Sequence, residues 1–320
     1  MRTVRKRVVH SARGAPARPD PSTGSGEGRT RLTAWRSVLI HLRLHFQLLL
    51  APVFLWGWLV AGGGFSWSIV LAFVAMHAFL YTGATAFNSY YDRDVGPIGG
   101  LAHPPPVVAA LLPVSLALKL LGLLLASLVN LLFALVYATF ALLSIAYSHP
   151  RVRLKGDPWA SLVTVGFGQG VLAFLGAWAA TRGELGAVVS SDGVLGALAA
   201  TLLILALYPL TQLYQVDEDR KRGDRTIAVV GGARLCFAFS LVCQVLGGAA
   251  MLAVVVGRYG PGDGLLILFG LAGQAVVVTW WARHFDPLAV LGNFRIVSAL
   301  NRASAALLGV YLVARLLMPR

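Results

Sequence analysis

The sequence predicts an all-α membrane protein, folded as a bundle of about nine transmembrane helices. Composition gives the first evidence: 57% of the 320 residues are hydrophobic and 12% are charged, whereas a soluble domain is usually about one quarter charged. A series of long apolar runs gives the second. The third is the distribution of Lys and Arg, which collect in alternate connections between these runs.

The chain divides into a basic N-terminal segment and one membrane domain. We expect residues 1–36 to form a disordered basic tail, because this segment is rich in Arg, Pro, Gly and Ser and lacks the apolar core of a cleavable signal peptide. An acid-poor, Arg-rich start also resembles a mitochondrial transit peptide, and this alternative stays open. Residues 37–320 then form a polytopic membrane domain.

Nine apolar runs follow the tail, and each is close to the length needed to cross the hydrocarbon core. Gly and Pro inside them are tolerable in a membrane bundle, where neighbouring helices can satisfy the freed backbone groups. Gly231 and Gly232 predict a helix break before the seventh run. The approximate limits of the runs are 38–61, 66–88, 107–127, 130–148, 159–180, 194–214, 233–256, 264–282 and 297–317.

The basic residues between the runs predict an orientation. The outer connections carry only Arg182 and Arg258, and the other loop cations fall in the inner ones. The positive-inside rule then places the N-terminus in the cytoplasm. We expect a multi-pass protein of the cell (inner) membrane, with the mitochondrial inner membrane as the alternative. The net charge of +14 does not indicate nucleic-acid binding, because it is spread over membrane-flanking loops.

Two short acidic clusters interrupt this apolar chain. Of its 13 acidic residues, two fall in residues 88–94 and four in residues 215–224. Each cluster follows an apolar run, and four predicted helices separate them, so both lie on the inner side and can share one site. Carboxylates near the membrane are costly unless something compensates them, and Mg²⁺ carrying a phosphorylated substrate would do so. We therefore predict a cytoplasmic-side active site.

The spacing of the first cluster defines how its side chains meet. Asn88 and Asp92 are four residues apart and share one helix face. Asp94 can join them only if the helix has ended, which Gly96 and Pro97 favour. If this cluster faces the second acidic cluster, in residues 215–224, the carboxylates of the two clusters could hold a diphosphate through two or more Mg²⁺ ions.

The second cluster behaves similarly. Gln215 and Asp219 share a face, while Asp217, Glu218 and Asp224 spread around the end of the helix. Cations stand nearby on the inner side, and a diphosphate would use them as charge partners. They are Arg153 and Lys155 in the connection after the fourth run, and Arg43 early in the first run.

At these residues the chain resembles the UbiA superfamily of intramembrane prenyltransferases, over roughly residues 38–317. The first motif of that family, Asn-x-x-x-Asp-x-x-x-Asp, matches at Asn88 and Asp92, but its last Asp is Gly96 here. The second motif, Asp-x-x-x-Asp, matches at Asp219, but its first Asp is Gln215. We expect Asp94 and Asp217 to take over the two missing positions, on irregular backbone beyond the helix ends.

The resemblance implies Mg²⁺-dependent transfer of a prenyl group from a polyprenyl diphosphate to an aromatic acceptor, with release of diphosphate. The implied partners are this donor, a hydrophobic or aromatic acceptor and the lipid bilayer. Asn88, Asp92 and Asp219 would be catalytic. The metal would be held by Asp92, Asp94, Asp217 and Asp219, and the substrate by Arg43, Tyr147, Arg153 and Lys155. The candidates to shield an allylic cation are Tyr90, Tyr91, Tyr147, Phe167 and Tyr214.

Two other functions stay open. An ion-coupled membrane transporter could use the carboxylates to bind a coupling ion, although acids in the middle of helices would favour it more than acids at helix ends do. An inactive relative acting as a scaffold is the other, because two motif positions have lost their Asp.

Overall fold

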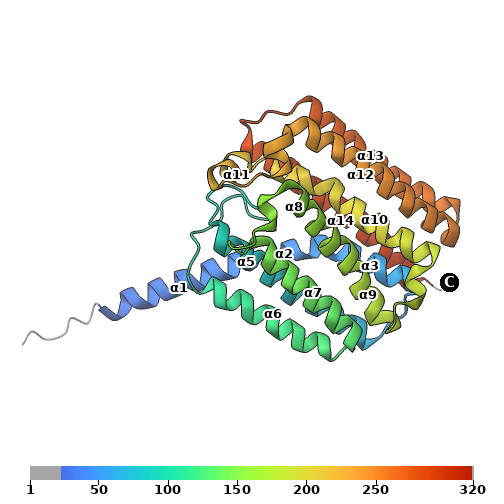
Figure 1. Ribbon diagram of the computed structural model, residues 1–320, viewed down its shortest axis with the longest axis horizontal. Coiled ribbons are helices and arrows are strands. Elements are labelled where there is room, and N and C mark those ends of the chain that lie inside the picture. Colours follow the sequence, from blue (N-terminus) through green and yellow to red (C-terminus); the bar gives the residue numbers. More distant parts are fainter. Residues whose placement is uncertain (1–22, 319–320) are drawn as a thin grey trace, which may run out of the picture.

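The computed structural model describes residues 23–318, with side chains from residue 32 onward. Within that range the chain is helical and forms no strand beyond one bridge between Ile98 and Leu101, so the all-α prediction is confirmed (Figure 1). The longer elements are α1 Thr23–Leu42, α3 Ala51–Val60, α4 Trp67–Val74, α5 Thr82–Asp92, α6 Leu111–Ser127, α7 Leu131–Ser148, α8 Pro158–Val165, α9 Ala173–Arg182, α10 Ser191–Gln212, α11 Val216–Arg222, α12 Ile227–Tyr259, α13 Pro261–Arg283 and α14 Val290–Leu317.

Each predicted apolar run corresponds to helical structure in the part of the chain that the structure describes. Eight helical stretches there are long and apolar enough to cross a membrane, and α6 is a shorter apolar helix of 17 residues. The chain is therefore a multi-pass membrane protein. Two of the stretches contain wider π-helical turns, η2 Ala75–Tyr81 and η4 Gly166–Leu172.

Positive backbone φ angles mark several helix boundaries. Arg43 (φ 48°) separates α1 from the short helix α2 Leu44–Gln47, and Arg93 (φ 51°) ends α5. Gly232 has φ 67° and ψ −178° inside α12, which confirms the predicted break at this glycine pair. Glycine adopts such angles without the steric cost that a side chain brings.

Helix α3 lies inside the bundle, where it contacts α9, α10 and α14. Trp56 of α3 is 1% exposed, and its indole N–H donates to the carbonyl of Gly196 on α10 over 2.9 Å. Next to it, Gly57 faces the backbone of α9: a Cβ added there would lie 2.5 Å from the carbonyl oxygen of Phe174. Helices α3 and α9 thus approach as closely as a glycine allows.

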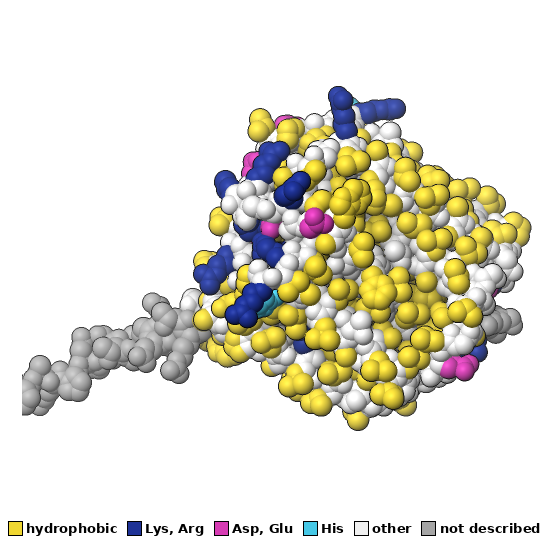
Figure 2. Space-filling view, viewed as in Figure 1, with side chains coloured by type: hydrophobic (Ala, Val, Ile, Leu, Met, Phe, Trp, Pro, Cys, Tyr) yellow, Lys and Arg dark blue, Asp and Glu magenta, His cyan; other side chains and the backbone are white. Residues whose placement is uncertain are grey.

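Charged side chains gather at one end of the bundle, around α11 and the loops beside it, whereas the sides of the helices are largely apolar (Figure 2). Both acidic clusters lie at this end, because the Glu218 carboxylate accepts a hydrogen bond from the Gly96 N–H over 2.7 Å. The prediction that the two clusters share one side is therefore confirmed. The membrane face to which this end belongs stays a prediction.

The N-terminal segment differs from the expectation in part. Residues 23–36, which we expected to belong to a disordered tail, form the first part of α1. The remainder of the expected tail, together with the transit-peptide alternative, falls on residues 1–22, outside the described residues.

The contact at Gly57 makes a prediction about stability. Gly57→Ala should lower the thermal unfolding temperature in detergent by several degrees, because the added methyl group overpacks against the α9 backbone at a cost of about 1–3 kcal/mol. The matched control is Gly257→Ala on α12, where an added Cβ meets no atom within 4 Å. Equal unfolding temperatures for the two variants would contradict the close contact.

Candidate active site

The first acidic cluster is positioned by the end of α5. Asp92 is the last residue of this helix, and the left-handed Arg93 turns the chain so that the side chain of Asp94 is only 3% exposed. The expectation that the helix ends before Asp94 is therefore met. Asn88 and Asp92 do share a face, because the Lys155 ammonium contacts both Asn88 Oδ1, over 2.6 Å, and Asp92 Oδ2.

The cations come from the connection between α7 and α8. Here Arg153 adopts φ 44°, and this left-handed residue starts a short 3₁₀ turn that buries Lys155. The Arg153 guanidinium forms two hydrogen bonds with Asp224, of 2.6 and 2.8 Å, and a longer one of 3.3 Å with Asp92. One arginine therefore connects the first acidic cluster to the second.

The second cluster is built on the short helix α11. Its first turn holds three acids and its last turn three bases, an order that complements the helix dipole. Gly223 (φ 80°) then turns the chain back, so that Asp224 is buried beside Asp219. The hydroxyl of Thr226 donates to Asp219 over 3.1 Å.

Arg222 joins the acids of both clusters. Its Nη1 contacts Asp94, its Nη2 donates to Asp219 over 2.6 Å, and its Nε donates to Asp224 over 3.2 Å. The four carboxylates in this network have side chains that are 3–8% exposed. Because a buried charge without a partner is very costly, these contacts hold the three loops together.

The expectation for Asp217 is wrong. Its side chain is 82% exposed and meets only Arg220, over 3.9 Å. We expected irregular backbone that would turn this acid inward, but the segment forms α11, and on a helix Asp217 points away from the face that carries Asp219. Gly223 ends α11 six residues after Asp217, so Asp217 stays on regular helix and does not turn toward the site.

Glu218 explains why the first motif tolerates a glycine. Its carboxylate oxygen accepts hydrogen bonds from the N–H groups of Val95 and Gly96, over 3.2 and 2.7 Å. A Cβ at Gly96 would lie 3.1 Å from that oxygen. An Asp in place of Gly96 would therefore meet a like charge.

A cavity of about 1000 Å³ leads away from the charged end. Arg43, Asn88 and Tyr147 line its polar end, and residues of α3, α7, α10, α13, α14 and η4 line much of the remainder. Along α14 the lining extends from Leu300 to Ala314, about 21 Å at 1.5 Å per helical residue. Its walls are mostly apolar.

Two of the predicted substrate-binding residues, Arg43 and Tyr147, line this cavity. The Arg43 side chain is buried and donates to the carbonyls of Gly99 and Thr85, over 2.8 and 2.9 Å. The Tyr147 hydroxyl lies 2.8 Å from that of Tyr208.

The other aromatic candidates lie elsewhere. Tyr90, Tyr91, Phe167 and Tyr214 do not line this cavity; Tyr214, for example, packs edge-on against Phe294. Sequence reasoning missed the other aromatic side chains that line the cavity, which are Phe46, Trp56, Tyr81, Phe140, Tyr208, Phe269 and Tyr311.

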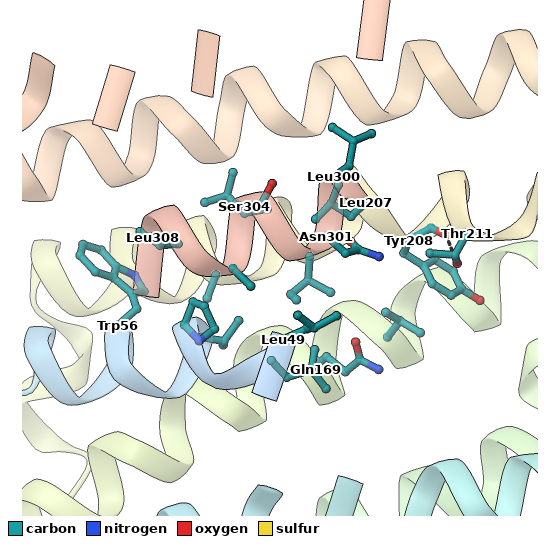
Figure 3. A pocket seen from close by; sticks show the side chains of 18 of the residues that line it. Leu49, Trp56, Gln169, Leu207, Tyr208, Thr211, Leu300, Asn301, Ser304 and Leu308 are labelled. Atoms are coloured by element: carbon teal, nitrogen blue, oxygen red, sulfur yellow. Dashed lines mark hydrogen bonds between the residues drawn. The ribbon is translucent and has the colours of Figure 1, made fainter. Parts of the chain in front are cut away.

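Two amides face the cavity at the same level (Figure 3). Gln169 comes from η4 and Asn301 from α14, on opposite walls between Tyr208 at one end and Trp56 at the other. Neither amide has a hydrogen-bond partner among the residues that the structure describes. Each lies 11 positions into its helical stretch, about 16 Å from its start at 1.5 Å per residue, or roughly half of a 30 Å hydrocarbon core.

Comparison with known proteins agrees with this arrangement. The sequence profile of the UbiA prenyltransferase family matches residues 49–306. The chain belongs to the UbiA prenyltransferase family. No curated protein matches the sequence.

Solved UbiA structures share the fold. A UbiA homologue from Aeropyrum pernix K1, in its apo form, is 23% identical, with a TM-score of 0.64 over 84% of this chain and 97% of that one. A homologue from Archaeoglobus fulgidus, bound to GPP and Mg²⁺, is 19% identical, with a TM-score of 0.62 over 85% of this chain and 99% of that one. Similarity at this level shows the fold alone.

The residues of this UbiA member supply part of a divalent-cation site, which substrate phosphates would complete. Among the described residues, no three side chains of His, Cys, Asp or Glu lie close enough to hold a metal ion by themselves. Mg²⁺ is usually held by one or two carboxylates, water and substrate phosphates. The oxygens of Asn88 and Asp92, which both contact Lys155, provide such a partial set. The carboxylates of Asp94 and Asp219, which both contact Arg222, add negative charge close by.

Burial raises the pKa values of Asp94 and Asp219, because nearby positive charge only partly offsets the loss of solvation. Burial, together with the charge of Asp92, raises the pKa of Asp94 to about 6 despite Arg222. Burial likewise raises the pKa of Asp219 to about 6, although Arg222 and Thr226 oppose the shift. Both acids therefore favour an additional cation near neutral pH.

The pKa values of Lys155 and Asp224 are both lowered, for different reasons. Burial lowers the pKa of Lys155, and the neighbouring Asp92 only partly offsets this. Burial alone would raise the pKa of Asp224, but its hydrogen bonds and ion pair with Arg153 bring the pKa below the usual value. Asp224 thus stays ionised as an anchor for the arginines.

Sequence reasoning did not assign roles to Arg222 and Glu218. The signal for Arg222 was present, because it follows Asp219 by three residues and therefore shares its helix face. Glu218 gave no such signal, since its partners are backbone N–H groups more than 120 residues away.

The raised pKa values predict how cation binding depends on pH. Between pH 7.5 and pH 5.5, Asp94 and Asp219 should take up protons, and the negative charge near Asn88 and Asp92 should fall. The affinity of the donor-free protein for Mn²⁺ should then decrease by up to about fourfold for each of the two carboxylates. Aspartates with ordinary pKa values near 3.9 would give almost no change.

A Mn²⁺ titration followed by electron paramagnetic resonance measures this effect. Asp94→Asn and Asp219→Asn should flatten the pH profile, whereas Asp217→Asn should leave it unchanged. A profile that is already flat in the unmodified protein would refute the raised pKa values.

Proposed function

We propose that this chain transfers a prenyl group from a prenyl diphosphate to an aromatic acceptor dissolved in the membrane, with Mg²⁺ and with release of diphosphate and of one proton from the acceptor. One observation carries the proposal: a network of four buried carboxylates and three cations adjoins an apolar cavity of about 1000 Å³, because Lys155 of the network contacts Asn88, which lines that cavity. A substrate with a highly charged head and a hydrocarbon tail matches both parts. The UbiA homologue from Archaeoglobus fulgidus was solved with GPP and Mg²⁺.

The diphosphate would bind at the charged end. Lys155, Arg153 and Arg43 supply fixed positive charge there, and arginine matches phosphate oxygens particularly well. When bound, Mg²⁺ would withdraw charge from the leaving diphosphate. Lys155 would exchange its contact with Asp92 for one with the diphosphate, and so stabilise the charge that develops as the carbon–oxygen bond breaks.

The tail would extend into the cavity from the same point. Asn88 and Tyr147 line its polar end, so the allylic carbon would lie beside the Tyr147 ring. An electron-rich ring face stabilises a cation that forms next to it. The low water content of an apolar cavity also protects such a cation from hydrolysis.

The acceptor would use the polar groups deeper in the cavity. A prenyl tail is pure hydrocarbon and gains nothing from the amides of Gln169 and Asn301, which remain costly at membrane level until a ligand or water pairs with them. A phenol or quinone oxygen would pair with them. These amides therefore favour an aromatic acceptor with a neutral oxygen over a pure hydrocarbon.

The location of the acids favours an enzyme over a transporter. A coupling-ion site would be expected near the middle of the membrane, but the carboxylates lie at the end of the bundle. We place the charged end on the cytoplasmic side of the cell membrane, on the basis of the loop cations. Purified protein in liposomes, given farnesyl diphosphate, Mg²⁺ and extracted membrane lipids, should form prenylated lipids detectable by mass spectrometry.

Substitution of the buried acids Asp92 and Asp219 should reduce activity far more than substitution of the exposed Asp217. Asp92→Ala and Asp219→Ala should each reduce prenyl transfer by about 10²–10³-fold, because each removes an anchor of the charges that stabilise the transition state. Asp217→Ala, which changes an 82% exposed acid on the same helix as Asp219, should retain nearly full activity. Normal turnover in a folded Asp92→Ala variant would exclude the proposed site.

The two amides should act on the acceptor alone. Gln169→Leu and Asn301→Leu should each raise the acceptor KM about fivefold, the equivalent of one net hydrogen bond of about 1 kcal/mol. Binding of a soluble prenyl diphosphate analogue should not change. The control is Ser304→Ala on the same face of α14, whose hydroxyl already pairs with Gln274 over 3.0 Å; a loss of donor binding in the amide variants would contradict this assignment.

A further inference from the structure

Arg222 uses every edge of its guanidinium on acids of the site. The three partners are Asp94 at Nη1, Asp219 at Nη2 and Asp224 at Nε. Asp94 belongs to the first acidic cluster, and the other two belong to the second. Arg222 is the one side chain in the described part of the chain that bonds to carboxylates of both Asp94 and Asp219.

This is the position that a bridging metal ion would need. A cation that joins the two clusters has to lie between their carboxylates, and Arg222 lies between Asp94 and Asp219. The described residues contain no group of three acids, histidines or cysteines that could hold a metal there. Arg222 separates the carboxylates that would otherwise form such a group.

The two departures from the family motifs fit the same picture. Gly96 and Gln215 stand where the motifs have Asp, so two motif positions carry no carboxylate. The space beside Gly96 is filled by the Glu218 carboxylate, which binds backbone N–H groups. Two carboxylates that the motifs would offer to metal ions are thus absent, and Arg222 occupies two of those that remain.

The contacts within the network leave little room for a second metal ion. Its four carboxylates, Asp92, Asp94, Asp219 and Asp224, contact the three cations Arg153, Lys155 and Arg222. Asp94 and Asp219 share the guanidinium of Arg222. A second divalent ion bound by these two acids would have to displace that guanidinium.

We propose that Arg222 serves as a built-in cation in place of a second metal ion, so that the donor binds with a single divalent ion. This inference rests on the proposed prenyl transfer. Arg222 keeps Asp94 and Asp219 together, and the single ion is held by the oxygens of Asn88 and Asp92 with the diphosphate. Lys155, which contacts both of these residues, turns to the diphosphate.

The number of bound metal ions tests this directly. The full chain in detergent is titrated with Mn²⁺ in the presence of geranyl S-thiolodiphosphate, a donor analogue that resists ionisation, and bound Mn²⁺ is counted by electron paramagnetic resonance. We expect one Mn²⁺ per protein in the unmodified chain. Arg222→Ala and Arg222→Gln should each bind two, because Asp94 and Asp219 become free to hold a second ion.

The control is Lys221→Ala, which removes the same charge from an exposed neighbour on α11 and should still bind one ion. Two ions in the unmodified chain would overturn the inference, and so would one ion in a folded Arg222 variant that retains the analogue. Arg222→Gln keeps the length of the side chain, so the test survives if Arg222→Ala does not fold. An unmodified chain that fails to bind the analogue with any Mn²⁺ would refute the proposed function itself.

Discussion

The need to pair buried charge governs the end of this bundle. Four carboxylates have side chains that are at most 8% exposed, and removing one partner from such an ion pair typically costs several kcal/mol. Arg153 and Arg222 each bind acids from two different loops. The three loops are therefore fixed relative to one another, and the mouth of the cavity keeps its shape before any substrate arrives.

The pairing also connects two very different environments. The charged network stays close to water at the end of the bundle, while the cavity beside it runs along α14 for about 21 Å. The π-helical turn η4 contributes Gln169 to the cavity wall, and its Gly170 packs against α10, where an added Cβ would lie 2.5 Å from Thr201 Cα. Such π-helical turns often mark functional sites. The bundle can thus bind a head and a tail of opposite character without a separate domain for each.

The sequence predicted the helices well because the lipid environment restricts the choice. Nearly every backbone group must be paired within its own segment, so long apolar runs become helices. The spacing of Asn88 and Asp92 also predicted a shared face, and both contact Lys155. The misplaced residue, Asp217, shows the limit: a segment crowded with charges formed a helix, because its acids precede its bases along the helix dipole.

What the sequence did not reveal depends on loop geometry. The positions of Asp94 and Asp224 follow from left-handed residues at Arg93 and Gly223, and a non-glycine residue with positive φ is uncommon. The partners of Glu218 and Arg222 follow from contacts between segments more than 120 residues apart. Neither kind of information is contained in local periodicity.

The left-handed residues have a consequence for engineering this protein. All three non-glycine residues with positive φ in the described chain are arginines, at positions 43, 93 and 153, and each left-handed residue carries roughly 1–2 kcal/mol of strain. A glycine would relieve that strain anywhere. At Arg43 and Arg153 it would also remove a cation from the cavity or its charged mouth, whereas the side chain of Arg93 is exposed and outside the network. Replacement by glycine can therefore stabilise the protein at Arg93 without affecting the site. At Arg43 and Arg153 the same replacement would remove a charge that the site needs.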